Sequence, residues 1–324
     1  MDHGHETERQ NRKDQVRREI AIFLALTAAL TAASIAVAAS QGVDVTRLGE
    51  ASLLGQVALF GQAFYPGIAA IVARLVTAGT LRCLGWGWGS TRRYLALSYA
   101  LPLAYCAVAY GPVWASGLAG FDPGRLAAGL PLAGLPEGVV ALGAALLALT
   151  VGVLPFLVLS LGEEIGWRGL MVPRLAGVMT LPKVALCSGL AWASFHAPLM
   201  LFVPGAVHGV PVPYAVACFA VTGVALSYPL AWLRLKSRSV WPAVVLHASH
   251  NAAVYLVCDP LTADSGNTAF FAGETGAGLA LACASIAALW WLYDRRAARG
   301  APSSAGAGTV PPAATPVSTA QVGK

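Results

Sequence analysis

The sequence predicts an all-α polytopic membrane protein with about eight transmembrane helices. Of its 324 residues, 57% are hydrophobic and 11% are charged, whereas soluble domains average roughly 45–50% and about 25%. A soluble surface with so few charges would aggregate, so this composition excludes an ordinary soluble globular enzyme. Apolar runs that can cross a hydrocarbon core of ~30 Å, about 20 residues each, recur at residues 20–40, 54–78, 94–116, 138–161, 182–201, 213–233, 241–258 and 276–293.

Basic residues predict the orientation of these spans, because Lys and Arg accumulate on the cytoplasmic side of a membrane. When the connections are assigned alternately to the two sides, 19 of the 21 Lys and Arg residues fall on the side that holds both termini. Only Arg47 and Arg125 fall on the other side, together with several acidic residues such as Glu274. We therefore expect an even number of spans with both termini in the cytoplasm. The net charge of +6 is thus a topology signal, and we expect the lipid bilayer, with no nucleic acid, as the partner of this surface.

The spans predict five segments along the chain. These are a charged cytoplasmic tail at 1–18, about three transmembrane helices at 19–137, a transmembrane core at 138–258, a last transmembrane helix at 259–299 and a disordered tail at 300–324. Residues 20–38 end in Ala36-Val37-Ala38 and have the alternative of a cleaved signal peptide, although their long apolar run and the acids before it favour an uncleaved helix. We expect an integral multi-pass protein of the plasma membrane.

Three apolar runs carry polar residues, although a charge in the bilayer core costs at least ~2.5–3.5 kcal/mol. The first run contains Glu163 and Glu164, the second contains His196, and the third contains His247 and Asn251. If the first helix runs on to about residue 176, a rise of 1.5 Å per residue places these side chains ~13–20 Å from their cytoplasmic flanks. Because three helices bring them to a similar depth, we predict a functional site there.

Spacing predicts how the charges of this site are balanced. Glu164 and Arg168 are four residues apart and share a helix face, so they can neutralise each other. Glu163 is then left as the unpaired carboxylate. On the second helix, Trp192 lies one turn before His196 on the same face.

The other polar and sulfur-containing residues of the spans are interpreted as structural. His250 points away from Asn251 on the same predicted helix. The six cysteines are scattered without a CxxC pair, so they indicate neither a disulfide framework nor a metal knuckle.

Two chemistries could use the polar groups. Glu163 can act as the general base that activates water, while imidazole N–H groups and the Asn251 amide stabilise the oxyanion. Alternatively, His196, His247 and Glu163 could hold a Zn²⁺ ion that lowers the pKa of its bound water. Both routes end in hydrolysis, so the cofactor is either none or zinc. The chain has no HExxH, GxSG or GxGD motif, so metallo-, serine and aspartyl intramembrane proteases of those types are unsupported.

The three motifs resemble those of the CPBP intramembrane protease family, which includes type II CAAX prenyl endopeptidases, lysostaphin resistance protein A-like proteins and the Abi group. The family pattern is EExxxR, FxxxH and HxxxN, each on a transmembrane helix. This sequence has EEIGWR at 163–168, WASFH at 192–196 and HASHN at 247–251. The resemblance covers roughly residues 140–256. Trp192 stands where the pattern has Phe, a departure that concerns the shape of the substrate pocket more than the chemistry.

The resemblance implies roles for the matched residues. Glu163 would activate water and His196 would help to position it. The oxyanion would be bound by His247 and Asn251. The site would be held together by Glu164 and Arg168, with Trp192 as an aromatic wall.

The function that follows is an intramembrane endopeptidase that cleaves a membrane-associated or lipidated protein or peptide. Two alternatives remain from other classes of protein. One is a non-catalytic membrane scaffold or immunity protein of the same fold. The other is a proton-coupled transporter with Glu163 and the histidines as a relay, although the inverted repeats of many transporters are not visible.

Overall fold

The structure is a computed structural model that describes residues 2–88, 92–130, 132 and 134–300. This part of the chain is almost entirely helical, with one short antiparallel pair of strands, β1 (Gly120–Phe121) and β2 (Thr262–Ala263). Seven of its helical segments are long and apolar enough to cross a membrane. The predicted all-α polytopic membrane fold is therefore confirmed. The prediction of a disordered tail falls on residues 301–324, which lie outside the described residues.

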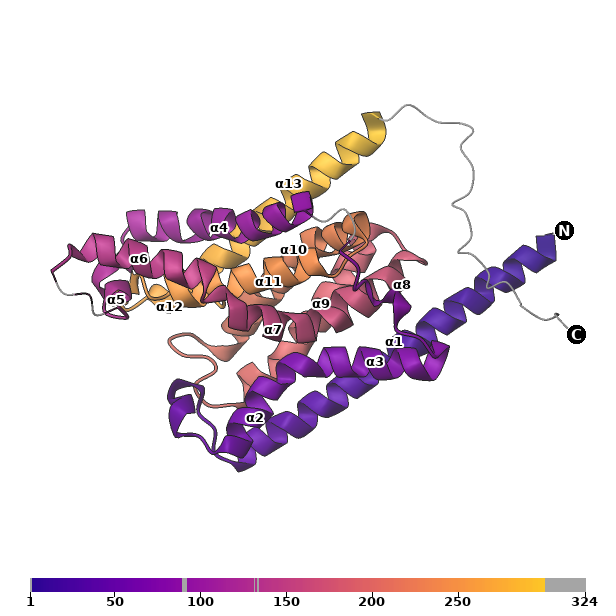
Figure 1. The fold of residues 1–324 in the computed structure, drawn as a ribbon, viewed down its shortest axis with the longest axis horizontal. Coiled ribbons are helices and arrows are strands. Elements are labelled where there is room, and N and C mark those ends of the chain that lie inside the picture. Colours follow the sequence, from indigo (N-terminus) through magenta and orange to yellow (C-terminus); the bar gives the residue numbers. More distant parts are fainter. Residues whose placement is uncertain (1, 89–91, 131, 133, 301–324) are drawn as a thin grey trace, which may run out of the picture.

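The helices follow the apolar runs of the sequence, and short 3₁₀ or π segments join several of them (Figure 1). The α-helices are α1 (Asp2–Ser40), α2 (Leu53–Gly61), α3 (Tyr65–Ala78), α4 (Arg92–Ala115), α5 (Pro123–Ala127), α6 (Glu137–Thr150), α7 (Val153–Glu164), α8 (Val172–Ala176), α9 (Leu181–Phe202), α10 (Val212–Ser237), α11 (Trp241–Ala253), α12 (Thr268–Phe271) and α13 (Ala277–Gly300). The 3₁₀ segments are η1 (Val45–Glu50), η2 (Gln62–Phe64) and η3 (Arg82–Leu84), and the π segments are η4 (Ile165–Met171) and η5 (Val254–Cys258).

The predicted span at 241–258 is not among the seven apolar segments. It is nevertheless helical throughout, because α11 continues directly into η5, and its polar residues His247, His250 and Asn251 lower its hydropathy. It packs against α4, α7 and α10 in the middle of the bundle. The segment carries the chain back across the molecule, so that the start of α1 and the end of α13 project from the same end (Figure 1). Both termini therefore leave from one side, as an even number of crossings requires.

Two predicted boundaries differ from the structure. The charged segment 1–18 is part of the same helix as the first span, since α1 is continuous from Asp2 to Ser40. The fourth span extends beyond 161, because α7, η4 and α8 carry the helical path on to Ala176. The expected continuation to about residue 176 is therefore present, with a π segment inside it.

Glycines allow the backbone of α3 to approach the helical path that carries the EExxxR motif. A Cβ atom added at Gly67 would lie 2.5 Å from the carbonyl oxygen of Gly162, and one added at Gly166 would lie 2.6 Å from Cβ of Pro66. Gly162 and Gly166 are four residues apart on one helix face, the small-xxx-small spacing that permits close packing in membranes. This contact fixes the position of α7 and η4 against α3.

A buried ion-pair cluster joins α1, α3 and α8 near the end of the molecule that holds the termini. Glu19 is 1% exposed, and its Oε1 lies 2.8 Å from Nη1 of Arg74 while its Oε2 lies 2.6 Å from Nε of Arg174. Thr77 also donates a hydrogen bond to Oε1 at 3.2 Å. A buried carboxylate requires such partners, and this one ties the first helix to the helical path of the site.

Candidate active site

Glu163 lies at the end of α7, and its carboxylate faces α9. Its Oε2 accepts a hydrogen bond of 2.9 Å from the indole Nε1 of Trp192, and Nε2 of His196 lies 3.6 Å from the same oxygen. The Glu163 side chain is nearly buried, at 7% exposure for the residue. Because Phe has no N–H group, the indole at position 192 adds a hydrogen bond to the aromatic surface expected there.

Glu164 and Arg168 form a fully buried ion pair. Both residues are 0% exposed, and Nη1 of Arg168 lies 2.7 Å from Oε1 of Glu164. The guanidinium also donates a hydrogen bond of 3.0 Å to Oγ of Ser227 on α10, and it lies over the ring of Trp192 with 4.9 Å to the centroid. The predicted pairing is present, and it neutralises the second carboxylate inside the bundle.

His247 contacts the second carboxylate of the EExxxR motif. Its Nδ1 lies 3.1 Å from Oε1 of Glu164, the oxygen that Arg168 also binds. Since a carboxylate only accepts, Nδ1 must carry the proton, and a neutral ring then presents Nε2 as an acceptor. Asn251 lies one turn further along α11 and is half-buried.

The π segment η4 follows Glu164 directly and carries Arg168. All seven of its residues are buried. The carbonyl oxygen of Arg168 accepts a hydrogen bond of 2.8 Å from Nε of Arg234 on α10. π segments inside α-helices occur frequently at functional sites, and this one begins just after Glu163, which contacts α9, and carries Arg168, which contacts α10.

Aromatic rings surround the imidazole of His196. Its ring centroid lies 4.9 Å from that of Phe195, 5.0 Å from that of Phe219 and 6.0 Å from that of Trp192. The Trp192 ring is also 5.2 Å from the ring of His247. These contacts hold the His196 ring beside Glu163. They also surround Glu163 and His196 with apolar groups, and electrostatic interactions are strong in such an environment.

A metal ion would need His, Cys, Asp or Glu side chains that converge on one point. Within the described residues, no three His, Cys, Asp or Glu side chains form a group that could hold one. His247 directs Nδ1 to Glu164, which leaves Nε2 of a neutral ring free to accept, and a carboxylate placed behind a histidine in this way is common in metal sites. A zinc ion held by Glu163, His196 and His247 therefore stays a prediction.

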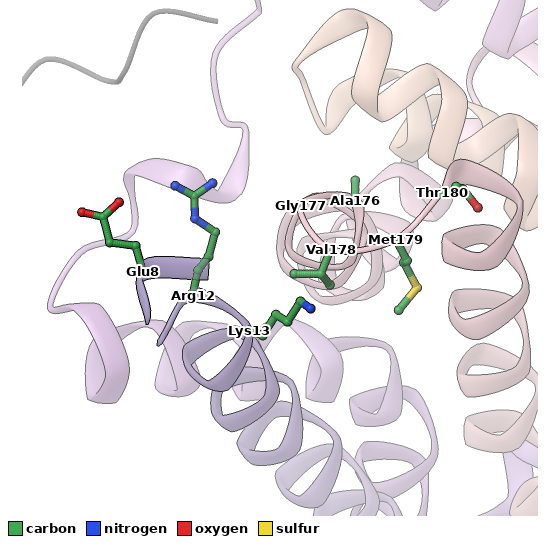
Figure 2. A pocket seen from close by; sticks show the side chains of 8 residues that line it. All are labelled: Glu8, Arg12, Lys13, Ala176, Gly177, Val178, Met179 and Thr180. Atoms are coloured by element: carbon green, nitrogen blue, oxygen red, sulfur yellow. The ribbon is translucent and has the colours of Figure 1, made fainter. Parts of the chain in front are cut away.

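Two cavities lie away from these polar residues. One, of about 640 Å³, separates the basic start of α1 from residues 176–180 between α8 and α9, and Figure 2 shows Glu8, Arg12 and Lys13 on one of its walls. The other, of about 610 Å³, is an apolar groove between α1 and α9. Trp167 and Phe195 line this groove, and Phe195 precedes His196 in the chain.

Several residues around the site were not predicted from the sequence. Ser227 carries no charge and gives no signal, while Arg234 was counted only as a cytoplasmic charge. His250, interpreted as structural, accepts a hydrogen bond of 2.8 Å at Nδ1 from Tyr105, and its Nε2 lies 3.3 Å from Oε1 of Glu274. Glu274 was assigned to an outer loop, and Tyr255 donates a hydrogen bond to its second oxygen.

The fold and this site define an integral multi-pass membrane protein with a carboxylate and two imidazoles gathered inside its helical bundle. Residues 145–253 match the family described as type II CAAX prenyl endopeptidase Rce1-like, and they contain all seven residues predicted for the site. The family resemblance of the three motifs is therefore confirmed for that segment. None of the curated proteins matches the sequence.

Proposed function

We propose that this protein is an intramembrane endopeptidase that hydrolyses a peptide bond of a membrane-associated or lipidated protein or peptide, with water activated by Glu163. The observation that carries the proposal is that two adjacent carboxylates have different partners. Glu164 is bound by Arg168 and His247, whereas Glu163 receives one indole hydrogen bond and faces His196. Glu163 therefore keeps the capacity to accept a proton.

The first step is attack of water on the scissile carbonyl carbon. A water molecule that contacts both Oε2 of Glu163 and Nε2 of His196 can bridge their separation of 3.6 Å. Glu163 takes one proton from this water as the new C–O bond forms and the carbonyl oxygen becomes an oxyanion. His196 fixes the direction from which the water attacks.

The oxyanion needs donors in the apolar bundle. The side-chain amide of Asn251 is a neutral donor. His247 can donate from Nε2 only as an imidazolium, because its Nδ1 proton is directed to Glu164. Glu164 favours that charged form, so we assign it the role of supporting His247 as well as Arg168.

The second step is collapse of the tetrahedral intermediate. The carbonyl re-forms, the C–N bond breaks, and the proton held by Glu163 passes to the leaving amine. The products are an amine and a carboxylic acid, which releases its proton as it ionises to a carboxylate, and Glu163 is again ionised. No redox partner is required for this cycle.

The groove between α1 and α9 supports an apolar group on the substrate. Its lining is almost entirely apolar, and Phe195 lies both in the groove wall and against the ring of His196. A lipid chain or an apolar peptide segment that occupies the groove would therefore lie beside the catalytic pair.

The test is cleavage of membrane-protein and lipopeptide substrates by the purified full-length protein in proteoliposomes. We expect Glu163→Gln to abolish cleavage and Glu50→Gln to leave it unchanged, because Glu50 is an exposed carboxylate of η1 whose side chain is 73% exposed. Circular dichroism and gel filtration show whether the variants keep the fold. Undiminished cleavage by folded Glu163→Gln would contradict the proposal and favour a non-catalytic scaffold.

A further inference from the structure

Arg234 on α10 is a buried cation whose partners are backbone carbonyl groups. The residue is 6% exposed, and none of the ion pairs within the described part of the chain includes it. Nε donates a hydrogen bond of 2.8 Å to the carbonyl oxygen of Arg168, and Nη2 donates one of 3.4 Å to that of Cys83. Because a buried charge is costly unless it is hydrogen-bonded, these carbonyl groups take the place of a counter-ion.

The π register of η4 leaves the carbonyl oxygen of Arg168 without a donor from its own helix. In an α-helix this oxygen would accept from the N–H of Val172, four residues on. Here the N–H of Val172 donates to the carbonyl oxygen of Trp167, five residues back. The donor that a π register would supply instead belongs to Pro173, which has no N–H. Nε of Arg234 therefore replaces a main-chain donor.

The turn around η3 covers the guanidinium of Arg234. Gly85 has a positive φ of 82°, and a Cβ atom added there would lie 2.7 Å from Nη2 of Arg234. The carbonyl oxygen of Gly85 accepts a hydrogen bond of 2.9 Å from the amide of Val240, which lies between α10 and α11. The guanidinium is thus enclosed by η3, η4 and α10, and this packing keeps it directed at the carbonyl oxygen of Arg168.

α10 holds both the main chain and the side chain of Arg168. Ser227 lies seven residues before Arg234, or about two turns along the same helix face, and its Oγ accepts a hydrogen bond of 3.0 Å from Nη2 of Arg168. Nη1 of Arg168 binds Oε1 of Glu164, and the same oxygen contacts Nδ1 of His247. A path of direct contacts thus leads from Arg234 to His247 through the buried ion pair.

We propose that Arg234 is a positioning residue, which holds η4 in its π register and so fixes the carboxylates of Glu163 and Glu164. Without a donor at position 234, the carbonyl oxygen of Arg168 is satisfied within its helix only if the N–H of Val172 returns to it, so the π and α registers compete. A shift of one residue turns a helix by ~100°, which moves these side chains away from their partners on other helices. The catalytic part of this proposal rests on the proposed peptidase function, whereas the register of η4 does not.

Three substitutions of Arg234 in the full-length protein separate the donor from the charge. Arg234→Met keeps most of the side-chain length without a donor. Arg234→Gln has its amide nitrogen as many bonds from Cα as Nε of arginine, so it keeps a donor and loses the charge. Arg234→Asn, whose amide is one methylene shorter, replaces Arg234→Met if that variant does not fold. Lys236→Met is the control, because Lys236 is an exposed cation of the same helix.

Steady-state kinetics in proteoliposomes, with a fluorogenic lipopeptide that the wild-type protein cleaves, measure the catalytic effect. We expect Arg234→Met to lower kcat about 10- to 100-fold with KM changed much less, because the site is misplaced and the substrate groove is intact. Arg234→Gln should stay within about threefold of the wild-type kcat, since a neutral donor is roughly half as strong as a charged one. Equal loss in the two variants, or wild-type kcat in Arg234→Met, would overturn the proposal.

Hydrogen–deuterium exchange measures the register without catalysis. In Arg234→Met, peptides that cover residues 165–172 should exchange about 10-fold or more faster than in the wild type, because each change of register breaks main-chain hydrogen bonds of η4. Peptides from α4 and α6 should be unchanged, and Arg234→Gln should match the wild type throughout. Faster exchange along the whole chain would indicate a general loss of stability and overturn the proposal, as would exchange in η4 that is no faster than in the wild type.

The two proposals fail separately. If Glu163→Gln cleaves like the wild type while Arg234→Met exchanges faster in η4 alone, the peptidase mechanism is wrong and the role of Arg234 in the π register stands. If Glu163→Gln is inactive while Arg234→Met keeps wild-type kcat and exchange, the peptidase mechanism stands and the positioning role is wrong.

Discussion

Nε1 of Trp192 lies 2.9 Å from Oε2 of Glu163, so an indole on α9 donates a hydrogen bond to the carboxylate on α7. The same indole ring lies under the guanidinium of Arg168 and beside the ring of His247. One side chain therefore touches both carboxylate systems of the site. Its indole N–H contacts Glu163, and its ring contacts Arg168 and His247, the two partners of Glu164.

Replacing Trp192 by Phe should separate these two functions. The ring contacts are largely kept, whereas the hydrogen bond to an ionised group, worth ~1.5–3 kcal/mol, is lost. We expect kcat to fall about 10- to 100-fold with KM changed much less, because Glu163 is no longer held in position. Steady-state kinetics in proteoliposomes measure this split, with Trp291→Phe on α13 as the control. A variant with wild-type kcat would show that the indole N–H plays no part in positioning.

Replacing Arg168 by Met should destabilise the fold, because it leaves Glu164 charged and buried at 0% exposure. Removal of one partner from a buried ion pair costs ~3–5 kcal/mol, while replacement of both is often nearly neutral. In detergent, the unfolding temperature of Arg168→Met should therefore fall well below that of the wild type. The unfolding temperature of Glu164→Gln/Arg168→Met should return towards the wild-type value. Arg47→Met serves as the control, since its ion pairs are exposed and contribute about 1 kcal/mol or less. If the unfolding temperature falls equally in the single and the double variant, the loss of stability does not come from the ion pair.

The close contact between α3 and η4 predicts a second stability effect. In Gly166→Ala the new Cβ would lie 2.6 Å from Pro66, and such overpacking costs ~1–3 kcal/mol. A Cβ atom added at Gly143 on α6 would meet nothing within 4 Å, so Gly143→Ala should unfold like the wild type. Unfolding midpoints in the same detergent compare the two. If both variants match the wild type, the backbone contact is not tight.

The sequence was sufficient to predict the helical spans and to select polar residues that the structure brings together inside the bundle. Hydrophobic length determines a span in a bilayer, and polar residues such as Glu163 and His196 are conspicuous against it because their burial in lipid is costly. The i, i+4 spacing of Glu164 and Arg168 likewise determines that their side chains can meet on one helix. These features depend on local sequence alone.

The partners across helices could not be predicted in the same way. Depth along a helix follows from counting residues, but rotation about its axis depends on packing, so the contact of His247 with Glu164 was not foreseen. Glu274 belongs to a loop whose path hydropathy does not describe, and it was assigned to the outer surface. The position of Glu19 between a charged tail and an apolar run did not indicate a buried residue, although Glu19 binds Arg74 and Arg174.

The proposed role of Glu163 as general base also predicts how the protein responds to metal chelation. Catalysis by Glu163 needs no Lewis acid, and within the described residues no three His, Cys, Asp or Glu side chains form a group that could hold a metal ion. We expect EDTA and 1,10-phenanthroline to leave cleavage unchanged, and elemental analysis of the active protein to find far less than one equivalent of zinc. His247→Ala should lose activity without any change in metal content. Stoichiometric zinc, with activity lost on chelation and restored by added Zn²⁺, would instead establish the metal-dependent route, in which Nε2 of His247 would be the ligand while Nδ1 keeps its contact with Glu164.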